Sequence, residues 1–477
     1  MVEPATVVEP VETRLVACVD FGSTFTKAAL VDSVTGELLA TASHRTTVDT
    51  DVLDGWDACL DRLGEAVPAA RTARVLACSS AGGGLRIGVV GNEELVTAEA
   101  GRRVALSSGG RVVHVASGGL DDGSLAALGR SAPDVLLLVG GTDGGNSEVL
   151  LSCARALADG RWGGPVVVAG NVEARDEVSG ILDASRTPHV LADNVVPQIG
   201  VLAPATARAA IREMFLRHVI GGKHLSRRAD FTAMVRGATP DVVLSAVELL
   251  ARGLDEERPG AGDVVVVDVG GATTDVHSVV ELPSTGLRTS DGDAGLSREV
   301  VAAVPVARTV EGDLGMRWSA TSAVDEGLAM QVLPADEAER LGDAARRRRA
   351  DPSYLPEDAE EKRTDRLIAA ASVAVAVRRH AGRQRVTFGQ GGRVVERSGR
   401  DLREVDLLVG SGGVLRAWPE EAAGILGAGT GDHLPGGWQV PRDPRLVVDR
   451  DYVLAPAGLL AEGHPEAAYR LLRTLIA

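Results

Sequence analysis

The chain has 477 residues, enough for two domains, and 45% of them are hydrophobic, so each domain can bury a sizeable core. A formal net charge of −16 argues against a protein that binds nucleic acid through a broad basic surface. No apolar run approaches the roughly 20 residues that span a bilayer, and the acidic N-terminus does not resemble a signal peptide. We therefore expect a cytoplasmic protein without membrane segments or nucleic-acid partners.

The first half of the chain predicts a flexible tail over residues 1–13, followed by alternating strands and helices. A hairpin meander is predicted over 15–48, and a helix over 54–66. Shorter apolar runs predict further strands, which lie at 74–78, 86–91, 111–116, 134–139, 165–169 and 189–191. Helical patterns follow several of these runs, which is typical of a mainly parallel sheet, and they lie at 146–158, 172–183, 197–220 and 226–254.

After a linker at 258–263, the second half restarts with the same pattern. An apolar run at 264–271 ends in Asp, Val and two glycines, as the run at 15–22 ends in Asp, Phe and Gly. A helical region at 335–380 and a strand near 405–410 follow. Two halves that each open with a strand, an aspartate and a glycine turn suggest an ancient duplication.

The first motif is DFGSTFTK, from Asp20 to Lys27. A strand delivers Asp20 at its end, Gly22 permits a tight turn, and successive backbone N–H groups can form a concave anion site. Lys27 adds a positive charge for a phosphate group. The residues that we expect to line this site are Gly22, Ser23, Thr24, Thr26 and Lys27. The alternative interpretation is an ordinary hairpin turn with polar residues.

The second motif is DVGGATTDVHSV, from Asp268 to Val279. Gly270 and Gly271 lack Cβ atoms, so the backbone can approach a phosphate closely there, and Ala272 and Thr273 continue the turn. Taken alone, the pattern also fits a meander with a tight turn. Two such loops about 250 residues apart could clamp one triphosphate from both sides, which favours a nucleotide site.

The third motif is VDLLVGSGGVLR, in which a strand runs into four small residues and then a helix. Glycines at the start of that helix would let an adenine and its ribose lie against the backbone. The residues in question are Gly410, Ser411, Gly412 and Gly413. A lone glycine cluster is a weak signal, but its position after two phosphate-type loops strengthens it.

These three motifs in this order resemble those of the actin, Hsp70 and sugar-kinase superfamily. The resemblance implies an α/β actin-like ATPase fold, with two ribonuclease-H-like domains around a nucleotide cleft and ATP and Mg²⁺ as cofactors. It also implies a first domain at 14–262 and a second at 263–477, with an inserted α/β subdomain at about 80–195. By the same analogy, Asp20 organises the hydration shell of the metal, and Asp268 holds the metal or orients the attacking water.

More closely, nearly the whole chain is similar to the MutL/GlmL family, found beside adenosylcobalamin-dependent glutamate mutase and related aminomutases. The segments that carry this resemblance are VDFGSTFTKAALVD, CSSAGGGLRIGVVG, VGGTDGGNSE, VVPQIG, VVDVGGATTDVHSV and VGSGGVLR. The resemblance implies a chaperone-like reactivating protein that hydrolyses ATP and has cobalamin-dependent mutase subunits as partners. The DxHxxG pattern of a cobalamin ligand is missing, so we do not expect the chain itself to be a mutase.

Two other ATP-dependent functions fit the same motifs. An amidohydrolase subunit of the hydantoinase/oxoprolinase type has similar loops, although its first loop usually reads DxGGTFTD, whereas this one ends in Lys27. A small-molecule kinase would need an acceptor pocket and a catalytic carboxylate that the sequence does not reveal.

Several remaining signals have two interpretations. The glycine-rich turns at 78–84 and 140–145 are either tight turns with helix caps or sites for a ligand or partner. His277 and His380 are single histidines, for which a structural role is expected. The four cysteines lie far apart without a CxxC pair, so neither a zinc site nor a disulfide framework is predicted, and Cys18 and Cys78 are expected to be buried thiols.

Overall fold

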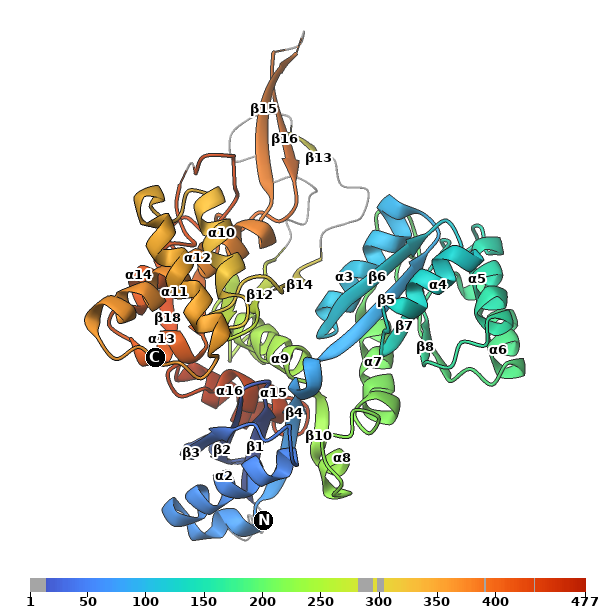
Figure 1. Ribbon diagram of the computed structural model, residues 1–477. Coiled ribbons are helices and arrows are strands. Elements are labelled where there is room, and N and C mark those ends of the chain that lie inside the picture. Colours follow the sequence, from blue (N-terminus) through green and yellow to red (C-terminus); the bar gives the residue numbers. More distant parts are fainter. Residues whose placement is uncertain (1–13, 282–294, 298–303, 390–391, 433) are drawn as a thin grey trace, which may run out of the picture. The chain divides into compact units, whose positions relative to one another are not determined.

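The computed structural model describes residues 14–281, 295–297, 304–389, 392–432 and 434–477 (Figure 1). The predicted tail at 1–13 lies outside these residues. The chain forms two compact units. Unit 1 contains the residues up to Leu85 together with Phe215–Pro259 and Asp451–Ala477, and unit 2 contains Arg86–Met214 and Gly260–Arg450. This grouping differs from the sequence-based division, because the C-terminal segment belongs to unit 1 and the inserted subdomain to unit 2.

Unit 1 is built on a five-stranded sheet in the order β10-β4-β1-β2-β3. Its strands are β1 (Leu15–Phe21), β2 (Phe25–Asp32), β3 (Leu38–Arg45), β4 (Arg74–Ser79) and β10 (Val235–Ala238). Strand β2 runs antiparallel to β1 and β3, whereas β1, β4 and β10 are parallel. Every residue of the central strand β1 is buried, as expected for an apolar run covered on both faces.

Helices from distant parts of the chain cover this sheet. They are α2 (Val52–Ala66), α8 (Asp230–Met234), α9 (Thr239–Arg252), α15 (Leu454–Leu460) and α16 (Pro465–Arg473). Helix α15 packs against α9 and β1, and α16 packs against α9 and α15, which places the C-terminal segment in unit 1. Helix α2 begins where the Asp51 side chain accepts a hydrogen bond from the Leu53 amide.

Two of the predicted helices in the first half are wrong in part. The region expected to be helical at 226–254 contains strand β10, whose pairing with β4 overrides the local helical pattern, and α9 starts only at Thr239, followed by Pro240 in its first turn. In the region 197–220, the α-helix begins at Ala205 and gives way to a π-helical turn at Phe215.

Unit 2 contains a second sheet with the same topology, in the order β14-β12-β11-β17-β18. Its strands are β11 (Val264–Val269), β12 (Thr274–Val279), β14 (Val306–Glu311), β17 (Leu407–Ser411) and β18 (Arg445–Val448). Here too the second strand runs antiparallel to the first and third, and the first, fourth and fifth are parallel. The shared strand order confirms the predicted fold class, an α/β fold of the actin-like type with two ribonuclease-H-like sheets.

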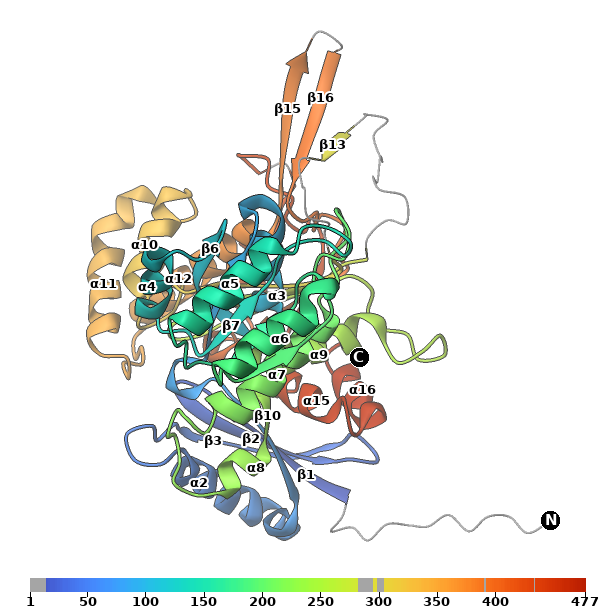
Figure 2. The ribbon, with the colours of Figure 1, turned by 90° about the vertical axis from the view of Figure 1, so that its right-hand side faces the viewer.

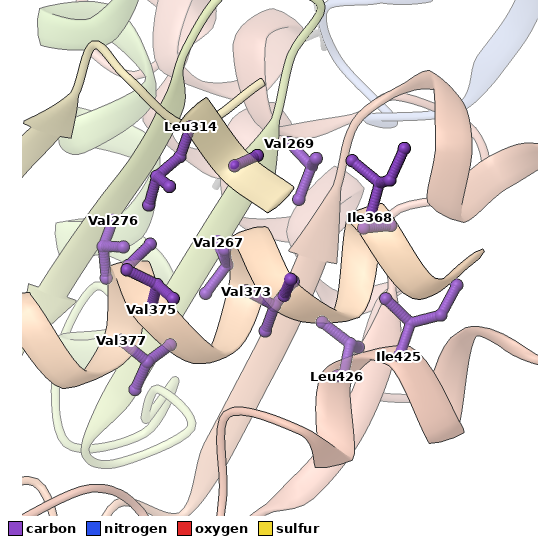
Figure 3. Close-up of a cluster of buried hydrophobic side chains, with 14 of the residues drawn as sticks. Val267, Val269, Val276, Leu314, Ile368, Val373, Val375, Val377, Ile425 and Leu426 are labelled. Carbon is purple, nitrogen blue, oxygen red and sulfur yellow. The ribbon is translucent and has the colours of Figure 1, made fainter. Parts of the chain in front are cut away.

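The core of this half of unit 2 lies between its sheet and helix α12. The helices are α10 (Ala320–Ala329), α11 (Ala338–Ala350), α12 (Ala359–His380), α13 (Gly413–Ala417) and α14 (Ala422–Gly427), which confirms the helical region expected at 335–380. Figure 3 shows α12 crossing the strands, with Val373, Val375 and Val377 close to Val267 and Val276. A separate small sheet of β13 (Gly295–Ser297), β15 (Arg383–Gly389) and β16 (Gly392–Ser398) extends away from this core (Figure 2).

The inserted subdomain has its own sheet, in the order β6-β5-β7-β8-β9. Its strands are β5 (Leu85–Gly91), β6 (Gly110–Ser117), β7 (Val135–Leu138), β8 (Val166–Val168) and β9 (His189–Leu191). Strands β5, β7, β8 and β9 are parallel. Its helices are α3 (Glu99–Ser107), α4 (Asp122–Arg130), α5 (Glu148–Asp159), α6 (Arg175–Ala184) and α7 (Ala205–Met214). Helices α3 and α7 touch each other on one side of the sheet, and α4, α5 and α6 lie on the other (Figure 1).

Across the described ranges, no helix is both long and apolar enough to cross a membrane.

Candidate functional site

The two phosphate-type motifs form equivalent turns, one in each unit. Asp20 pairs in register with Lys27 across β1 and β2, and Asp268 pairs with Asp275 across β11 and β12. In each turn, the glycine two residues after the aspartate donates a backbone hydrogen bond to the residue three positions on, at 3.2 Å in unit 1 and 2.9 Å in unit 2. A Cβ on Gly22 would lie 2.7 Å from the Phe25 carbonyl oxygen, so only glycine fits there.

Asp20 is almost fully buried at the end of β1 and is held by several neighbours. Its Oδ1 accepts a hydrogen bond from the Thr239 hydroxyl at 2.6 Å, and its Oδ2 accepts one from the Tyr452 hydroxyl. The Cys78 Sγ also lies 3.6 Å from Oδ1. Burial and, secondarily, the Asp20 carboxylate raise the pKa of the Cys78 thiol well above its usual range, so it stays protonated and donates.

Lys27 contacts both Asp20 and Tyr452. Its Nζ is 3.9 Å from the Asp20 Oδ2 and also 3.9 Å from the centroid of the Tyr452 ring. Tyr452 has a φ of 57°, in the left-handed region that non-glycine residues rarely occupy. Such backbone strain persists where surrounding contacts enforce it and is concentrated at functional sites. The sequence reading missed both Thr239 and Tyr452.

The carbonyl groups of the first turn are engaged by one residue at the end of β3. The Thr46 hydroxyl donates to the Gly22 carbonyl at 2.8 Å, and the Thr46 amide donates to the Thr24 carbonyl at 2.9 Å. Ser23 is exposed and Thr24 half-buried, whereas Thr26 is fully buried with its hydroxyl 3.3 Å from that of Thr46. The Thr26 hydroxyl therefore lies beneath the turn, and Ser23 and Thr24 lie on its accessible side.

The second turn is held from one side by the segment 316–319. The Met316 amide donates to the Gly270 carbonyl at 3.0 Å, and the amides of Arg317 and Trp318 donate to the Gly271 carbonyl at 2.8 and 2.9 Å. The Ser319 hydroxyl donates to the Ala272 carbonyl at 2.7 Å.

This bracing fixes the direction of three successive backbone amides. In a planar trans peptide, the N–H group points opposite to the carbonyl of the same peptide unit. The carbonyls of Gly270, Gly271 and Ala272 all bind the segment 316–319. The amides of Gly271, Ala272 and Thr273 therefore point together away from it, which is the arrangement of a backbone anion site.

The GSGG motif lies beside this turn, because β17 is the parallel neighbour of β11 and Ser411 pairs in register with Asp268. Gly412 has a φ of 110°, and a Cβ there would lie 2.3 Å from the Val269 carbonyl oxygen. A Cβ on Gly413 would meet no atom within 4 Å. The structure thus brings Asp268, the second turn and GSGG together at the carboxyl ends of two adjacent parallel strands, where ligands bind in open α/β sheets.

A further buried carboxylate follows the next strand at the same edge. Asp449 comes directly after β18, is fully buried, and donates its amide to the Gly410 carbonyl at 2.9 Å. The sequence reading missed it because the short strand β18 was not predicted.

Each turn, taken by itself, carries one aspartate of the kind that binds Mg²⁺ at a nucleotide site. Within the described part of the chain, no group of three or more His, Cys, Asp or Glu side chains is placed to hold a metal ion. Mg²⁺ in nucleotide sites is commonly bound through one or two carboxylates, phosphate oxygens and waters. Both Asp20 oxygens already accept hydrogen bonds from hydroxyl groups, so a contact through metal-bound water suits that residue best.

Comparison with known proteins assigns the family. The model of the family described as MutL protein matches residues 16–476. The chain belongs to the MutL family. One relative, the protein MutL of Clostridium tetanomorphum, is 36% identical over 462 residues, which cover 95% of this chain and 97% of that protein.

Solved structures that resemble this MutL-family protein do so at low identity. A nucleotide-free acetone carboxylase aligns with 94% of this chain and 70% of that chain, at 16% identity and a TM-score of 0.39. The alignment with the ethanolamine utilization protein EutJ from Carboxydothermus hydrogenoformans covers 96% of this chain and 93% of that chain, at 12% identity and a TM-score of 0.29. The alignment with xylulose kinase from Bifidobacterium adolescentis covers 97% of this chain and 93% of that chain, at 10% identity and a TM-score of 0.30. The fold assignment therefore rests on the strand order of the two sheets.

In this MutL-family protein, the turn at 140–145 is braced by its own neighbours. The Asp143 Oδ1 accepts from the Asn194 side chain at 2.8 Å and from the Val172 amide at 3.2 Å, and the Gly144 amide donates to Glu173 at 2.9 Å. The Asn146 side chain accepts from the Glu148 amide at 2.8 Å at the start of α5. These contacts support the interpretation as a tight turn with a helix cap.

The other ambiguous turn, at 78–84, follows β4 beside β1, as GSGG follows β17 beside β11. The Ser79 hydroxyl at its start is buried and makes no hydrogen bond with the described residues. By position, this turn is the unit 1 counterpart of GSGG.

His277, His380 and the four cysteines are buried. His380 is 2.8 Å from the Ser278 hydroxyl and 3.0 Å from the Thr309 hydroxyl, and burial lowers its pKa well below the usual value, so it is neutral at pH 7. Burial, and then the nearby charge of Arg308, lowers the pKa of His277 in the same direction. Cys18 and Cys78 are buried free thiols as predicted, and so are the other two cysteines.

Proposed function

We propose that this MutL-family protein binds and hydrolyses ATP with Mg²⁺ and serves as an accessory protein of an adenosylcobalamin-dependent mutase. The observation that carries the nucleotide part is the convergence of the three amides of Gly271, Ala272 and Thr273, on a turn whose carbonyls are all engaged elsewhere. Such an array supplies fixed donors for phosphate oxygens without reorganisation when the ligand arrives.

The remaining roles follow from position within each unit. Lys27, Gly22, Ser23 and Thr24 are proposed to contact phosphate oxygens in unit 1, with Thr26 supporting the turn from below. Asp20 is proposed to orient the water shell of Mg²⁺, and Asp268 to hold the metal or orient the attacking water. Bound Mg²⁺ would neutralise phosphate charge as it develops during hydrolysis. Gly410, Ser411, Gly412 and Gly413 are proposed to lie against adenosine.

Binding of Mg-ATP is expected to raise the melting temperature. A ligand that binds only the folded state stabilises it by about 2.7 kcal/mol at a free concentration of about 100 times the dissociation constant. The measurement is a thermal shift with ATP and Mg²⁺ at millimolar concentration, with GTP and with Mg²⁺ alone as controls. An unchanged melting curve with Mg-ATP would contradict the nucleotide assignment.

The accessory role is supported by family membership and by the inserted subdomain, which has a five-stranded sheet of its own besides the two duplicated sheets. We propose that this subdomain docks the mutase and that the bound nucleotide controls docking. A ligand shifts a conformational equilibrium only through its different affinity for the two states, so ATP and ADP must differ in effect.

The corresponding experiment is a pull-down of the genomically neighbouring mutase subunits with ATP, with ADP and without nucleotide. We expect recovery to depend on the nucleotide. Equal recovery in all three conditions, or none in any, would contradict nucleotide-controlled docking. Recovery that survives deletion of residues 80–195 would move the docking site out of the inserted subdomain.

A further inference from the structure

Asp275 occupies in unit 2 the position that Lys27 occupies in unit 1. Lys27 pairs in register with Asp20, but Asp275 pairs in register with Asp268, so two carboxylates occupy opposite positions beside the second turn. Like charges directly opposite on a sheet destabilise it unless a cation compensates. The compensating cation is Arg308 on β14.

Arg308 is nearly fully buried and joins two separate parts of unit 2. Its Nε lies 2.9 Å and its Nη2 2.5 Å from the Asp275 Oδ1. Its Nη1 donates to the carbonyl oxygens of Leu106 and Gly110, both at 3.1 Å. These two carbonyls belong to the corner between α3 and β6 of the inserted subdomain, residues 106–110.

The corner is a suitable anchor for a guanidinium group. The last carbonyls of a helix lack partners within the helix and carry the negative end of its dipole. Leu106 lies in the last turn of α3, and α3 itself packs against β14. Arg308 therefore binds the inserted subdomain through backbone atoms whose position depends on how α3 ends.

The other oxygen of Asp275 reaches the phosphate-type turn. The Thr273 hydroxyl is 3.4 Å from Asp275 Oδ2, a long hydrogen bond that another acceptor could replace. One carboxylate thus touches the turn through Oδ2 and, through Oδ1 and Arg308, the corner at 106–110. We infer that Arg308 is a positioning residue that couples occupation of the second turn to the order of the inserted subdomain.

This inference rests on the proposed ATP binding. It adds a chain of contacts through which ATP binding affects the inserted subdomain. When a phosphate oxygen replaces Asp275 as the acceptor of the Thr273 hydroxyl, the Asp275 carboxylate loses a hydrogen bond and its contact with Arg308 changes. The hydrogen bonds from Arg308 to the carbonyls of the corner at 106–110 change in turn. Lysine cannot replace this arrangement, because one ammonium group lacks the planar fork that binds Asp275 and two carbonyls together.

The test is hydrogen–deuterium exchange of the full-length protein with and without Mg-ATP, read at peptides covering residues 99–117. In the wild-type protein, Mg-ATP is expected to slow exchange there by about 5-fold, the lower end of typical coupling between sites. Arg308→Lys is expected to reduce this effect below about 2-fold, because it keeps the charge but breaks the three-way contact. A purely structural role would change exchange equally with and without ATP.

Two further variants make the result decisive. Asp275→Asn breaks the same link from the other side and serves if Arg308→Lys does not fold. Arg155→Lys is the matched control, since it makes the same chemical change on α5 of the same subdomain, where Arg155 forms only half-exposed ion pairs with Glu148 and Glu177. In Arg155→Lys, Mg-ATP is expected to slow exchange at residues 99–117 as much as in the wild type.

The outcomes separate this inference from the proposed function. If wild-type protein binds ATP by calorimetry but exchange at 99–117 does not change, the coupling is wrong and ATP binding stands. Wild-type protection in both Arg308→Lys and Asp275→Asn, or an equal loss in Arg155→Lys, would also overturn it. If the wild type does not bind ATP, the proposed function itself fails, and the coupling with it.

Discussion

Replacement of Asp268 by alanine is expected to slow ATP hydrolysis by about 10²–10³-fold, the usual effect of losing one preorganised electrostatic group. Asp268 stands at the end of the central strand β11, in register with Ser411 and immediately before the turn whose amides converge. Because those amides belong to the backbone, the variant keeps its phosphate donors. We therefore expect the loss mainly in kcat, measured as steady-state phosphate release, with ATP affinity changed much less.

The control for this variant is Asp343→Ala in α11, which removes a half-exposed carboxylate that pairs with Arg346 one helical turn away. Exposed pairs of this kind contribute little to stability, so turnover should stay at the wild-type level. Normal turnover in Asp268→Ala would contradict the proposal that this residue holds the metal or orients the attacking water. An equal loss in both variants would indicate a general defect of unit 2.

The sequence predicted the features of the site that depend on short local patterns. An apolar strand ending in Asp and a glycine turn can be recognised twice, and the structure shows both as equivalent turns with matching register. The strand leading into GSGG was also predicted, within two residues of its observed bounds. These patterns are visible because burial of the central strands and the tight turns constrain each residue locally.

The contacts around Asp20 could not be predicted, because they depend on how distant segments pack. Thr239 follows β10, a strand of four residues inside a region with a helical pattern, and such a short edge strand is defined by pairing with β4. Tyr452 reaches Asp20 across 432 positions from a segment that sequence order assigns to the other half.

Asp275 shows a different limit of sequence reading. It stands in the recognised motif, yet its role depends on Arg308, which lies 33 residues further on, and on carbonyl groups of the inserted subdomain. Backbone acceptors leave no residue-type signature. Only the alignment of the two turns by register identifies Asp275 as the counterpart of Lys27.

The GSGG motif allows the structural and ligand-binding roles of its glycines to be separated. Gly412→Ala is expected to destabilise unit 2 by about 2–4 kcal/mol, because the new Cβ meets the Val269 carbonyl and the left-handed backbone is strained for alanine. The change can be followed by tryptophan fluorescence during unfolding, since Trp162, Trp318, Trp418 and Trp438 all lie in unit 2. A stability equal to wild type would contradict the close approach of Gly412 to β11.

Gly413→Ala is the matched variant, one residue away and with the same added methyl group. Its Cβ would meet no atom of the protein within 4 Å, and the residue begins helix α13, where alanine is favoured over glycine. We therefore expect stability unchanged or slightly higher. If adenosine lies against this backbone, the methyl group would occupy its place, and ATP affinity should fall by about 10-fold or more, a cost of about 1.4 kcal/mol. Unchanged ATP affinity in a stable Gly413→Ala protein would exclude Gly413 from the adenosine site.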